Sequence, residues 1–268
     1  MKINKISYGK QPFVQQNGVK TTSFKSSFRS VYNDNFSLKY NTNTCFFRSD
    51  LKWNNFVDYI YQKYKNVNKV NVIDYACSTG EEPVSLSMMM DLKLGNDAEK
   101  FYPIKAYDID EDNIIKAKNG VFDVTKDELT LLRNNIGNEH KKYFICHIDS
   151  DEQLGKFRLK EEYKKNFIFN QSDIIKDFNK IPSKNTILLC RNIFPYLQIG
   201  ESKKLIKQIS KILDLSSVIV LGKFDIDYGI EKLFEKEGFI HTEQYNVMEK
   251  LPYYKVLFKK FLHRFKLK

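Results

Sequence analysis

Short apolar runs alternate with amphipathic stretches along the middle of this 268-residue chain, and this alternation restricts the possible folds more than any other feature. The run KVNVIDYA (Lys69 to Ala76) is followed by a turn and by helical spacing from about Glu81 to Leu92. The run PIKAYDID (103–110) is followed by a short helical stretch around Asp112 to Lys118. A strand, helix, strand, helix order predicts a parallel sheet whose crossover helices cover its faces.

The same rhythm resumes near residue 166 and continues toward the end of the chain. A helix is also expected before the first strand, over Trp53 to Tyr64, from the spacing of its apolar residues. The remaining expected elements are strands in NFIFN (166–170), NTILLC (185–190) and SVIVLG (217–222), helices over Glu201 to Leu213 and near Ile230 to Lys236, and last strands in GFIHTEQY (238–245) and YYKVLF (253–258).

Between the two regular parts, YFICHI and KFRLKEEY alternate in the manner of a small antiparallel hairpin, at about residues 143–163. Seven strands, mostly parallel, with a final pair after a helix, predict an α/β fold of the Rossmann-like class I methyltransferase type. We expect a seven-stranded, mostly parallel sheet with helices on both faces and a small inserted β-hairpin subdomain. The number of strands alone leaves a dehydrogenase or a kinase open.

The formal net charge of +11 is concentrated at the two ends of the chain. Residues 1–40 carry +6 and residues 250–268 carry +7, which leaves −2 for residues 41–249. We predict a poorly ordered polar and basic extension over 1–40, a methyltransferase domain over 41–261 with an inserted β-subdomain at about 120–165, and a basic tail over 262–268. Basic ends attract phosphates, anionic membranes or acidic protein faces, although most are simply solvated.

Cysteine and histidine usage argues against two kinds of site. The cysteines are scattered without CxxC pairing and apart from the histidines, which predicts neither a disulfide framework nor a metal site. No apolar run reaches the roughly 18 to 20 residues of a membrane span, and the N-terminus lacks the apolar segment of a signal peptide. The expected location is therefore cytoplasmic.

The turn after the first strand, DYACSTGEEP (Asp74 to Pro83), combines one glycine with two glutamates. It lacks the lysine of a Walker loop and the GxGxxG of a dinucleotide loop, and Glu81 and Glu82 would repel a polyphosphate. A carboxylate at a helix start instead suits a ligand with a cationic amine, and S-adenosylmethionine fits that description. Small residues would let it lie against the backbone: Ala76, Ser78 and Gly80. The alternative is that both glutamates simply fill the first turn of a helix.

Acidic residues at the ends of the next two strands favour a nucleoside ligand. Asp108 ends the second strand, where a carboxylate accepts hydrogen bonds from both ribose hydroxyls. Asp173 follows the third strand in FNQSDII, where it can accept a hydrogen bond from the adenine amino group, with Ile174 against the ring. Three successive strands thus deliver suitable groups to the same edge of the sheet.

Four motifs together resemble the CheR-type chemotaxis-receptor glutamate methyltransferases. They are TNTCFFR, CSTGEEP, AYDIDEDNIIKAKNGVF and CRNIFPYL, and the similarity runs in order from about Asn41 to Leu221. The resemblance implies transfer of a methyl group from S-adenosylmethionine to a glutamate side chain of a receptor-like protein, as a γ-methyl ester. It also implies that the partner is the cytoplasmic domain of a methyl-accepting chemotaxis receptor.

The resemblance assigns the cofactor and substrate contacts at the start of the site. Thr44 and Arg48 of TNTCFFR would reach over the cofactor and the substrate carboxylate. Glu82, rather than Glu81, would hold the methionine amine, beside Gly80. Because a glutamate carboxylate is already a nucleophile at pH 7, catalysis needs positioning more than a general base, and the permanent planar charge of Arg48 suits that task.

Further roles follow for the second half of the site. Asp108 would take the ribose and Asp173 the adenine, although the family usually has Asn at the latter place. Arg191 and Asn192 of CRNIFPYL would close the pocket. Tyr196 would line the methyl-transfer site, as the second catalytic residue after Arg48.

Several departures from the family pattern qualify these expectations. Residues 1–40 lack the helical pattern of the family's basic front domain, Thr42 replaces a usual Asn, and GKFD (222–225) lacks the usual ending of that strand. Tyr75 is bulky where the family's loop is small, so its ring must point into the protein. The hairpin at about 143–163 matches the place of the family's β-subdomain, which docks on receptors.

Other functions stay open at this point. One is a catalytically silent scaffold that binds S-adenosylmethionine, and another is a methyltransferase acting on nucleic acid or a small molecule. A nucleic-acid amino methyltransferase would carry [DN]PP[YF] after the fourth strand, which RNIFPYL does not match, so we expect no nucleic-acid partner. We expect a monomer, with contact between the basic ends and a membrane surface or receptor array as a further possibility.

Overall fold

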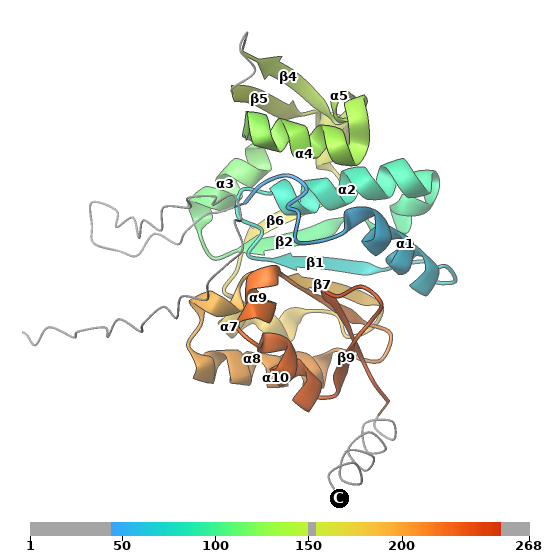
Figure 1. Cartoon of the computed structure of the whole chain (residues 1–268), viewed down its shortest axis with the longest axis vertical. Coiled ribbons are helices and arrows are strands. Elements are labelled where there is room, and N and C mark those ends of the chain that lie inside the picture. The colour runs from blue at the N-terminus through green and yellow to red at the C-terminus, as the bar shows by residue number, and fades with distance from the viewer. Residues whose placement is uncertain (1–43, 150–153, 253–268) are drawn as a thin grey trace, which may run out of the picture. The chain divides into compact units, whose positions relative to one another are not determined.

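The main sheet of the computed structural model, which describes residues 44–149 and 154–252, has seven strands in the order β6-β2-β1-β7-β8-β10-β9 (Figure 1). The parallel strands β6 to β8 pair in register, with Ile73 opposite both Lys105 and Leu188. Their bounds are β1 (Asn71–Tyr75), β2 (Ile104–Asp108), β6 (Phe167–Gln171), β7 (Thr186–Cys190) and β8 (Val218–Leu221). β10 (Val247–Lys250) runs antiparallel to β8 and to the edge strand β9 (Phe239–His241). The predicted seven-stranded, mostly parallel sheet is confirmed.

Helices cover both faces of this sheet. One face carries α1 (Trp53–Lys63), α2 (Glu81–Leu94) and α3 (Glu111–Asn119), and the other carries α7 (Ile174–Asp177), α8 (Ile199–Ile212) and α10 (Ile230–Lys236) (Figure 1). The helices α1, α3, α8 and α10 bury one face, as Trp53, Phe56, Val57 and Ile60 do in α1, whereas α2 is buried over most of its length. Complete burial of one such side chain stabilises the fold by roughly 1.5–3 kcal/mol. The five predicted helices are therefore confirmed.

The most deeply buried strands of the main sheet contain almost only apolar residues. The central strands β7 and β8 are buried along their whole length and read TILLC and VIVL, as expected for parallel strands covered on both faces. At the end of β1, the ring of Tyr75 stacks on that of Tyr107, with ring centroids 5.0 Å apart, and lies in the core cluster that includes Phe178. The ring is 3% exposed, so the prediction that Tyr75 points into the protein is confirmed.

The inserted subdomain is larger than the predicted hairpin. The expected pair, β4 (Phe144–Ile148) and β5 (Leu154–Leu159), is antiparallel, but β5 also pairs with β3 (Val121–Thr125), which the sequence analysis missed. The hairpin prediction is therefore corrected to a three-stranded sheet. The helix α4 (Lys126–Ile136) was missed as well; it begins with a capping box in which Thr125 and Glu128 exchange hydrogen bonds. Buried residues of the three strands join the core beneath α2.

Short helices complete the described chain. They are α5 (His140–Tyr143), α6 (Glu161–Lys164) and α9 (Lys223–Asp227), with 3-10 turns η1 (Gly95–Phe101), η2 (Gly137–Glu139), η3 (Phe178–Lys180) and η4 (Phe194–Tyr196).

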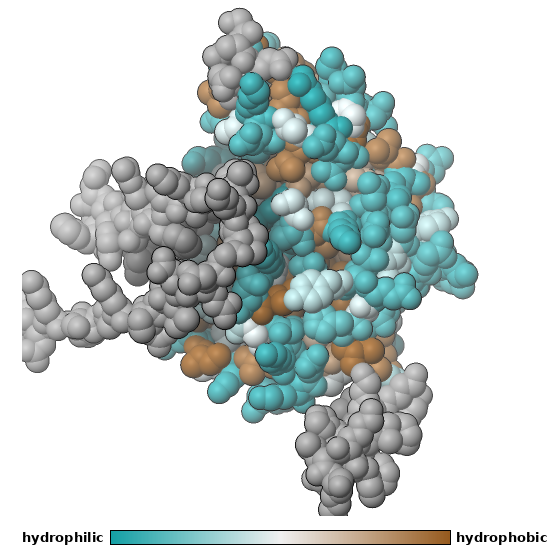
Figure 2. Space-filling model, in the orientation of Figure 1, coloured by the Kyte–Doolittle hydropathy of each residue, from teal (hydrophilic) through white to brown (hydrophobic). Residues whose placement is uncertain are grey.

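The end of the sheet differs from the prediction. The strand that completes it is Val247–Lys250, whereas the predicted strand YYKVLF (253–258) lies outside the described residues. The predicted extension (1–40) and tail (262–268) lie outside them too. Within the described ranges, no helix is long and apolar enough to cross a membrane. The face seen in Figure 2 carries mostly hydrophilic residues, with hydrophobic ones in small patches.

Candidate active site

The carboxyl ends of β6, β2, β1 and β7 lie side by side at one edge of the sheet, because these strands are parallel neighbours. The turn after β1 connects directly to this edge. Its backbone adopts left-handed φ angles at Ala76 (60°), Ser78 (52°) and Gly80 (99°). A Cβ on Gly80 would lie 3.2 Å from Cβ of Ala117, so both the φ angle and the close packing require glycine there. The predicted small-residue turn is thus present and tightly held.

The two glutamates of this turn have different surroundings. Glu81 accepts hydrogen bonds from the Thr79 hydroxyl at 2.8 and 2.7 Å and one from Thr44, and burial raises its pKa to about 7. Glu82 accepts one hydrogen bond on Oε2, from Nη1 of Arg191 at 2.5 Å. Its Oε1 is buried and has no partner among the described residues. Only Glu82 therefore keeps an oxygen for a ligand, which is compatible with its predicted role.

Arg191, predicted to close the pocket, lies in the protein interior. Its side chain is 1% exposed, forms ion pairs with Asp50 and Glu82, and packs over the ring of Trp53 at 5.2 Å. A buried guanidinium is tolerable because two carboxylates compensate for its lost hydration. Burial works to raise the pKa of Asp50, but the charges of Arg191 and Arg48 and the hydrogen bonds from the Lys223 amide and Asn192 together outweigh it, and the pKa is lowered. Arg191 acts as the centre of a buried charge cluster under the turn.

Asn192 is fixed between two loops. Its φ is 58°, its Oδ1 accepts a hydrogen bond from the Phe224 amide at 3.0 Å, and its Nδ2 is 3.4 Å from Oδ2 of Asp50. A Cβ on Gly222 would lie 2.2 Å from Oδ1 of Asn192, so only glycine fits beside it. Asn192 thus joins the ends of β7 and β8.

Asp225 organises the same corner, and the sequence analysis treated it only as a departure from the family. Its carboxylate accepts hydrogen bonds from three backbone amides, those of Asn192, Phe194 and Gly222, at 2.5, 3.1 and 2.8 Å. Burial raises the pKa of Asp225 to about 7. Asp50 was missed as well. Neither acid has a regular sequence signal, because Asp50 lies in an irregular segment, Asp225 lies in the short helix α9, and both meet partners far along the chain.

The residues predicted to bind the nucleoside lie at the ends of β2 and β6, as expected from the sequence. Asp108 ends β2; its Oδ2 accepts the Ser78 amide at 2.8 Å and its Oδ1 accepts the Asp110 amide at 2.9 Å. Asp173 caps α7 just after β6, with Oδ1 accepting the Ile175 amide at 2.9 Å, and Ile174 follows it in the core. Each carboxylate therefore has a structural task at this edge and keeps lone pairs for a ligand.

The two predicted catalytic residues, Arg48 and Tyr196, lie in different surroundings. The guanidinium of Arg48 lies over the ring of Phe224, 5.5 Å from its centroid. Its charge acts on Asp50 and Glu82, which locates it beside the buried cluster. Tyr196 ends the 3-10 turn after Asn192, and its side chain is exposed. The structure brings Arg48 to the cluster but leaves Tyr196 at the surface.

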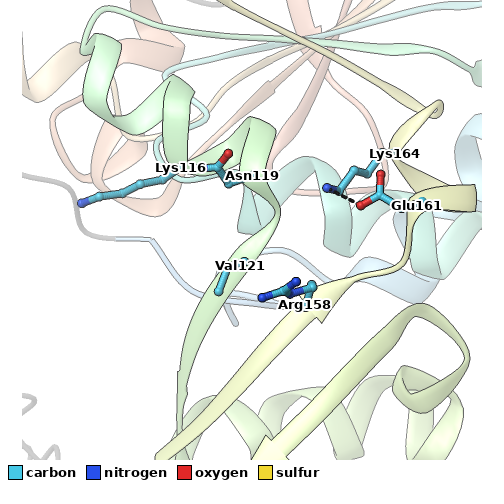
Figure 3. A pocket seen from close by; sticks show the side chains of 6 residues that line it. All are labelled: Lys116, Asn119, Val121, Arg158, Glu161 and Lys164. Carbon is cyan, nitrogen blue, oxygen red and sulfur yellow. Dashed lines mark ion pairs between the residues drawn. The ribbon is translucent and has the colours of Figure 1, made fainter.

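A separate hollow of about 360 Å³ lies between α3 and the second sheet (Figure 3). Lys116, Asn119, Val121, Arg158, Glu161 and Lys164 line it. Glu161 pairs with Lys164 at 2.8 Å, across the hollow from Arg158. None of the predicted site residues lines this hollow, so it is distinct from the site at the carboxyl edge.

Fold and site together define a class of protein. A seven-stranded sheet with one antiparallel strand near its edge is the architecture of Rossmann-like methyltransferases. Glu82 after β1, Asp108 at the end of β2 and Asp173 after β6 present carboxylates rather than a phosphate-binding loop. The class is therefore that of the methyltransferases that depend on S-adenosylmethionine.

Comparison with known sequences gives the family. The family model described as "CheR methyltransferase, SAM binding domain" matches residues 42–241. The chain belongs to the CheR methyltransferase family, and S-adenosylmethionine is its cofactor. The match contains all the predicted site residues, from Thr44 to Tyr196.

Named relatives are moderately similar. A chemotaxis protein methyltransferase of Listeria monocytogenes is 24% identical over 196 residues, covering 70% of this chain and 68% of the relative. The chemotaxis protein methyltransferase of Escherichia coli strain K12 is 23% identical over 163 residues, covering 61% of this chain and 54% of the relative. Among solved structures, magnesium protoporphyrin IX methyltransferase from Synechocystis PCC 6803, with bound SAM, aligns with a TM-score of 0.37 and 13% identity, over 74% of this chain and 78% of that one.

Proposed function

We propose that this chain transfers methyl groups from S-adenosylmethionine to glutamate side chains of a chemotaxis-receptor-like protein, forming γ-methyl esters. The observation that carries the proposal is the buried Oε1 of Glu82 at the carboxyl edge of β1, which has no partner within residues 44–149 and 154–252, in a chain of the CheR family. The names of the curated relatives, chemotaxis protein methyltransferases, support a receptor as the methyl acceptor.

The residues at the edge fit the cofactor. Besides Oε1 of Glu82, the Oγ of Ser78 is buried without a partner among the described residues, so the turn offers two unused polar atoms. Glu82 would hold the amine, Asp108 the ribose, and Asp173 with Ile174 the adenine. When bound, S-adenosylmethionine supplies a methyl group on a positively charged sulfur. The protein's own residues then have to place an acceptor in line with it.

The acceptor needs no general base. A glutamate carboxylate has a pKa of about 4.3 and is ionised at pH 7. One of its oxygens forms the new carbon–oxygen bond as the carbon–sulfur bond breaks, and no proton moves. Arg48 would restrain the incoming carboxylate through its planar, permanent charge, and its position over Phe224 supports that role. The exposed ring of Tyr196 would contact the acceptor segment.

The reaction is tested by incubating the full chain with methyl-labelled cofactor and the cytoplasmic domain of a chemotaxis receptor. Release of volatile labelled methanol on treatment with base is expected, because a γ-methyl ester hydrolyses readily while a methylated amine does not. Arg48→Ala should reduce methanol release at least tenfold. Lys207→Ala is the control, since it removes an exposed cation from α8 and should leave the rate unchanged.

The outcomes separate the alternatives. Base-stable label would mean a different acceptor atom and would refute the glutamate ester. Cofactor binding without any transfer would favour a catalytically silent scaffold. We also propose that the chain binds the receptor domain as a monomer, with its basic ends available for contact with a membrane surface or a receptor array.

A further inference from the structure

Asp74, near the end of β1, is a buried acid with no hydrogen-bond partner in the described part of the chain. Its side chain is 1% exposed, and neither of its two oxygens meets a donor among the described residues. Asp108, at the equivalent end of the neighbouring strand, is also buried but accepts two backbone amides. A buried carboxylate with no donor is unfavourable as an anion, so Asp74 needs a proton or a nearby cation.

Charged groups surround Asp74 on three sides. Glu82 approaches it from α2, Arg191 from the end of β7, and Asp108 from β2. Arg191 already pairs with Asp50 and Glu82, so an ionised Asp74 would be a third carboxylate near one guanidinium. The nearby thiols of Cys77 and Cys190 are buried and add no positive charge.

The balance favours the protonated acid. Burial raises the pKa of Asp74 well above its ordinary value, the charge of Glu82 raises it further, and Arg191 opposes both. Arg48 offsets part of the negative charge on Asp50 and Glu82. A cation arriving at the free oxygen of Glu82 would neutralise the nearest charge that keeps the proton on Asp74.

We propose that Asp74 carries a proton in the ligand-free protein and releases it to solvent when a cationic amine binds at Glu82. The O–H bond of the Asp74 carboxyl breaks, and its electron pair stays on oxygen. The buried cluster thus loses one proton and gains the positive charge of the ligand's amine. This inference rests on the proposed function for the identity of the amine, the methionine end of S-adenosylmethionine or of its product. Asp74 thereby makes the site selective for nucleosides that carry an amino-acid end.

Titration calorimetry with S-adenosylhomocysteine in two pH 7 buffers of different ionisation enthalpy measures the released protons. The wild-type chain should release about one proton per ligand, and its affinity should rise about tenfold per pH unit while Asp74 titrates. 5′-Methylthioadenosine, which lacks the amino-acid end, should bind without proton release. Asp74→Asn should remove most of the proton release with S-adenosylhomocysteine and leave the unfolding temperature of the ligand-free protein at or above the wild-type value.

Asp58→Asn is the control, because Asp58 is an exposed carboxylate on α1 that pairs with Lys93, outside the proposed site. Its proton release should equal that of the wild type. Binding of S-adenosylhomocysteine without proton release, or equal release from Asp74→Asn, would overturn the inference and leave the proposed function intact. Absence of any binding would overturn both. The comparison of the two ligands on the wild-type chain decides the question even if Asp74→Asn does not fold.

Discussion

The adjacent glutamates at the start of α2 allow a sharp test of the cofactor site. Glu82→Gln and Glu81→Gln make the same chemical change one residue apart. Glu82 has a free buried oxygen, whereas both oxygens of Glu81 accept the Thr79 hydroxyl. The proposed site therefore predicts that only the change at Glu82 weakens binding of the cofactor or its product.

The size of the effect follows from the charges. A hydrogen bond to a charged group contributes about 1.5–3 kcal/mol, and its loss corresponds to roughly 10- to 150-fold weaker binding. In Glu82→Gln the new amide would keep a carbonyl oxygen for Arg191, so the stability of the free protein should fall by only about 1 kcal/mol. Glu81→Gln keeps an acceptor for Thr79 and should change affinity by less than about threefold.

Calorimetric titration with S-adenosylhomocysteine gives the affinities, and urea unfolding gives the stability of each variant. Comparable loss of affinity in both variants would mean that the turn acts as a structural unit and that Glu82 is not the amine ligand. The reasoning also fails if Glu82→Gln binds within about twofold of the wild type. A large stability loss in Glu82→Gln alone would assign the residue to the support of Arg191.

Two further predictions concern the surroundings of the site. Gly222→Ala should lower the free energy of unfolding in urea by about 1–3 kcal/mol, because the new Cβ would lie 2.2 Å from Oδ1 of Asn192. The control Gly200→Ala, whose Cβ would meet nothing within 4 Å, should be neutral or stabilising. Equal losses of unfolding free energy in the two variants would contradict this prediction. His140 is buried against Phe157. Its Nδ1 lies 3.0 Å from the Gly137 carbonyl oxygen, its Nε2 has no partner among the residues that the structure describes, and burial lowers its pKa. The folded protein thus resists protonation at His140, so its free energy of unfolding should be at its full value above about pH 6.5 and fall below that pH. In His140→Phe the unfolding free energy, measured in urea between about pH 5 and 8, should depend less on pH. The same pH dependence in the variant and the wild type would refute the argument.

The elements with strong periodicity could be read directly from the sequence. β7 and β8 are continuous apolar runs, and α8 repeats apolar residues at helical spacing, so burial decides their structure locally. β3 and α4 could not be read in this way. β3 has only five residues, in which buried Phe122 and Val124 alternate with exposed Asp123 and Thr125, and α4 is polar over most of its length. Both depend on the core that they share with α2, which no local window contains.

The same distinction applies within the site. Parallel strands bring their carboxyl ends to one edge, so Glu82, Asp108 and Asp173 could be assigned to a common site from strand positions alone. Which oxygen atoms stay free is decided by contacts between residues far apart in the sequence. Arg191 reaches Glu82 across 109 residues of chain and Asp50 across 141.

These long-range pairs also explain why the turn has two glutamates. Glu81 accepts the hydrogen bond from the Thr79 hydroxyl in the turn. Glu82 accepts a hydrogen bond from Arg191 on one oxygen and keeps the other oxygen for a ligand. The guanidinium keeps Glu82 oriented in the free protein, so the ligand does not have to order that side chain on binding. A single glutamate could not do both tasks, because an oxygen used to hold the turn is no longer available to a cationic ligand.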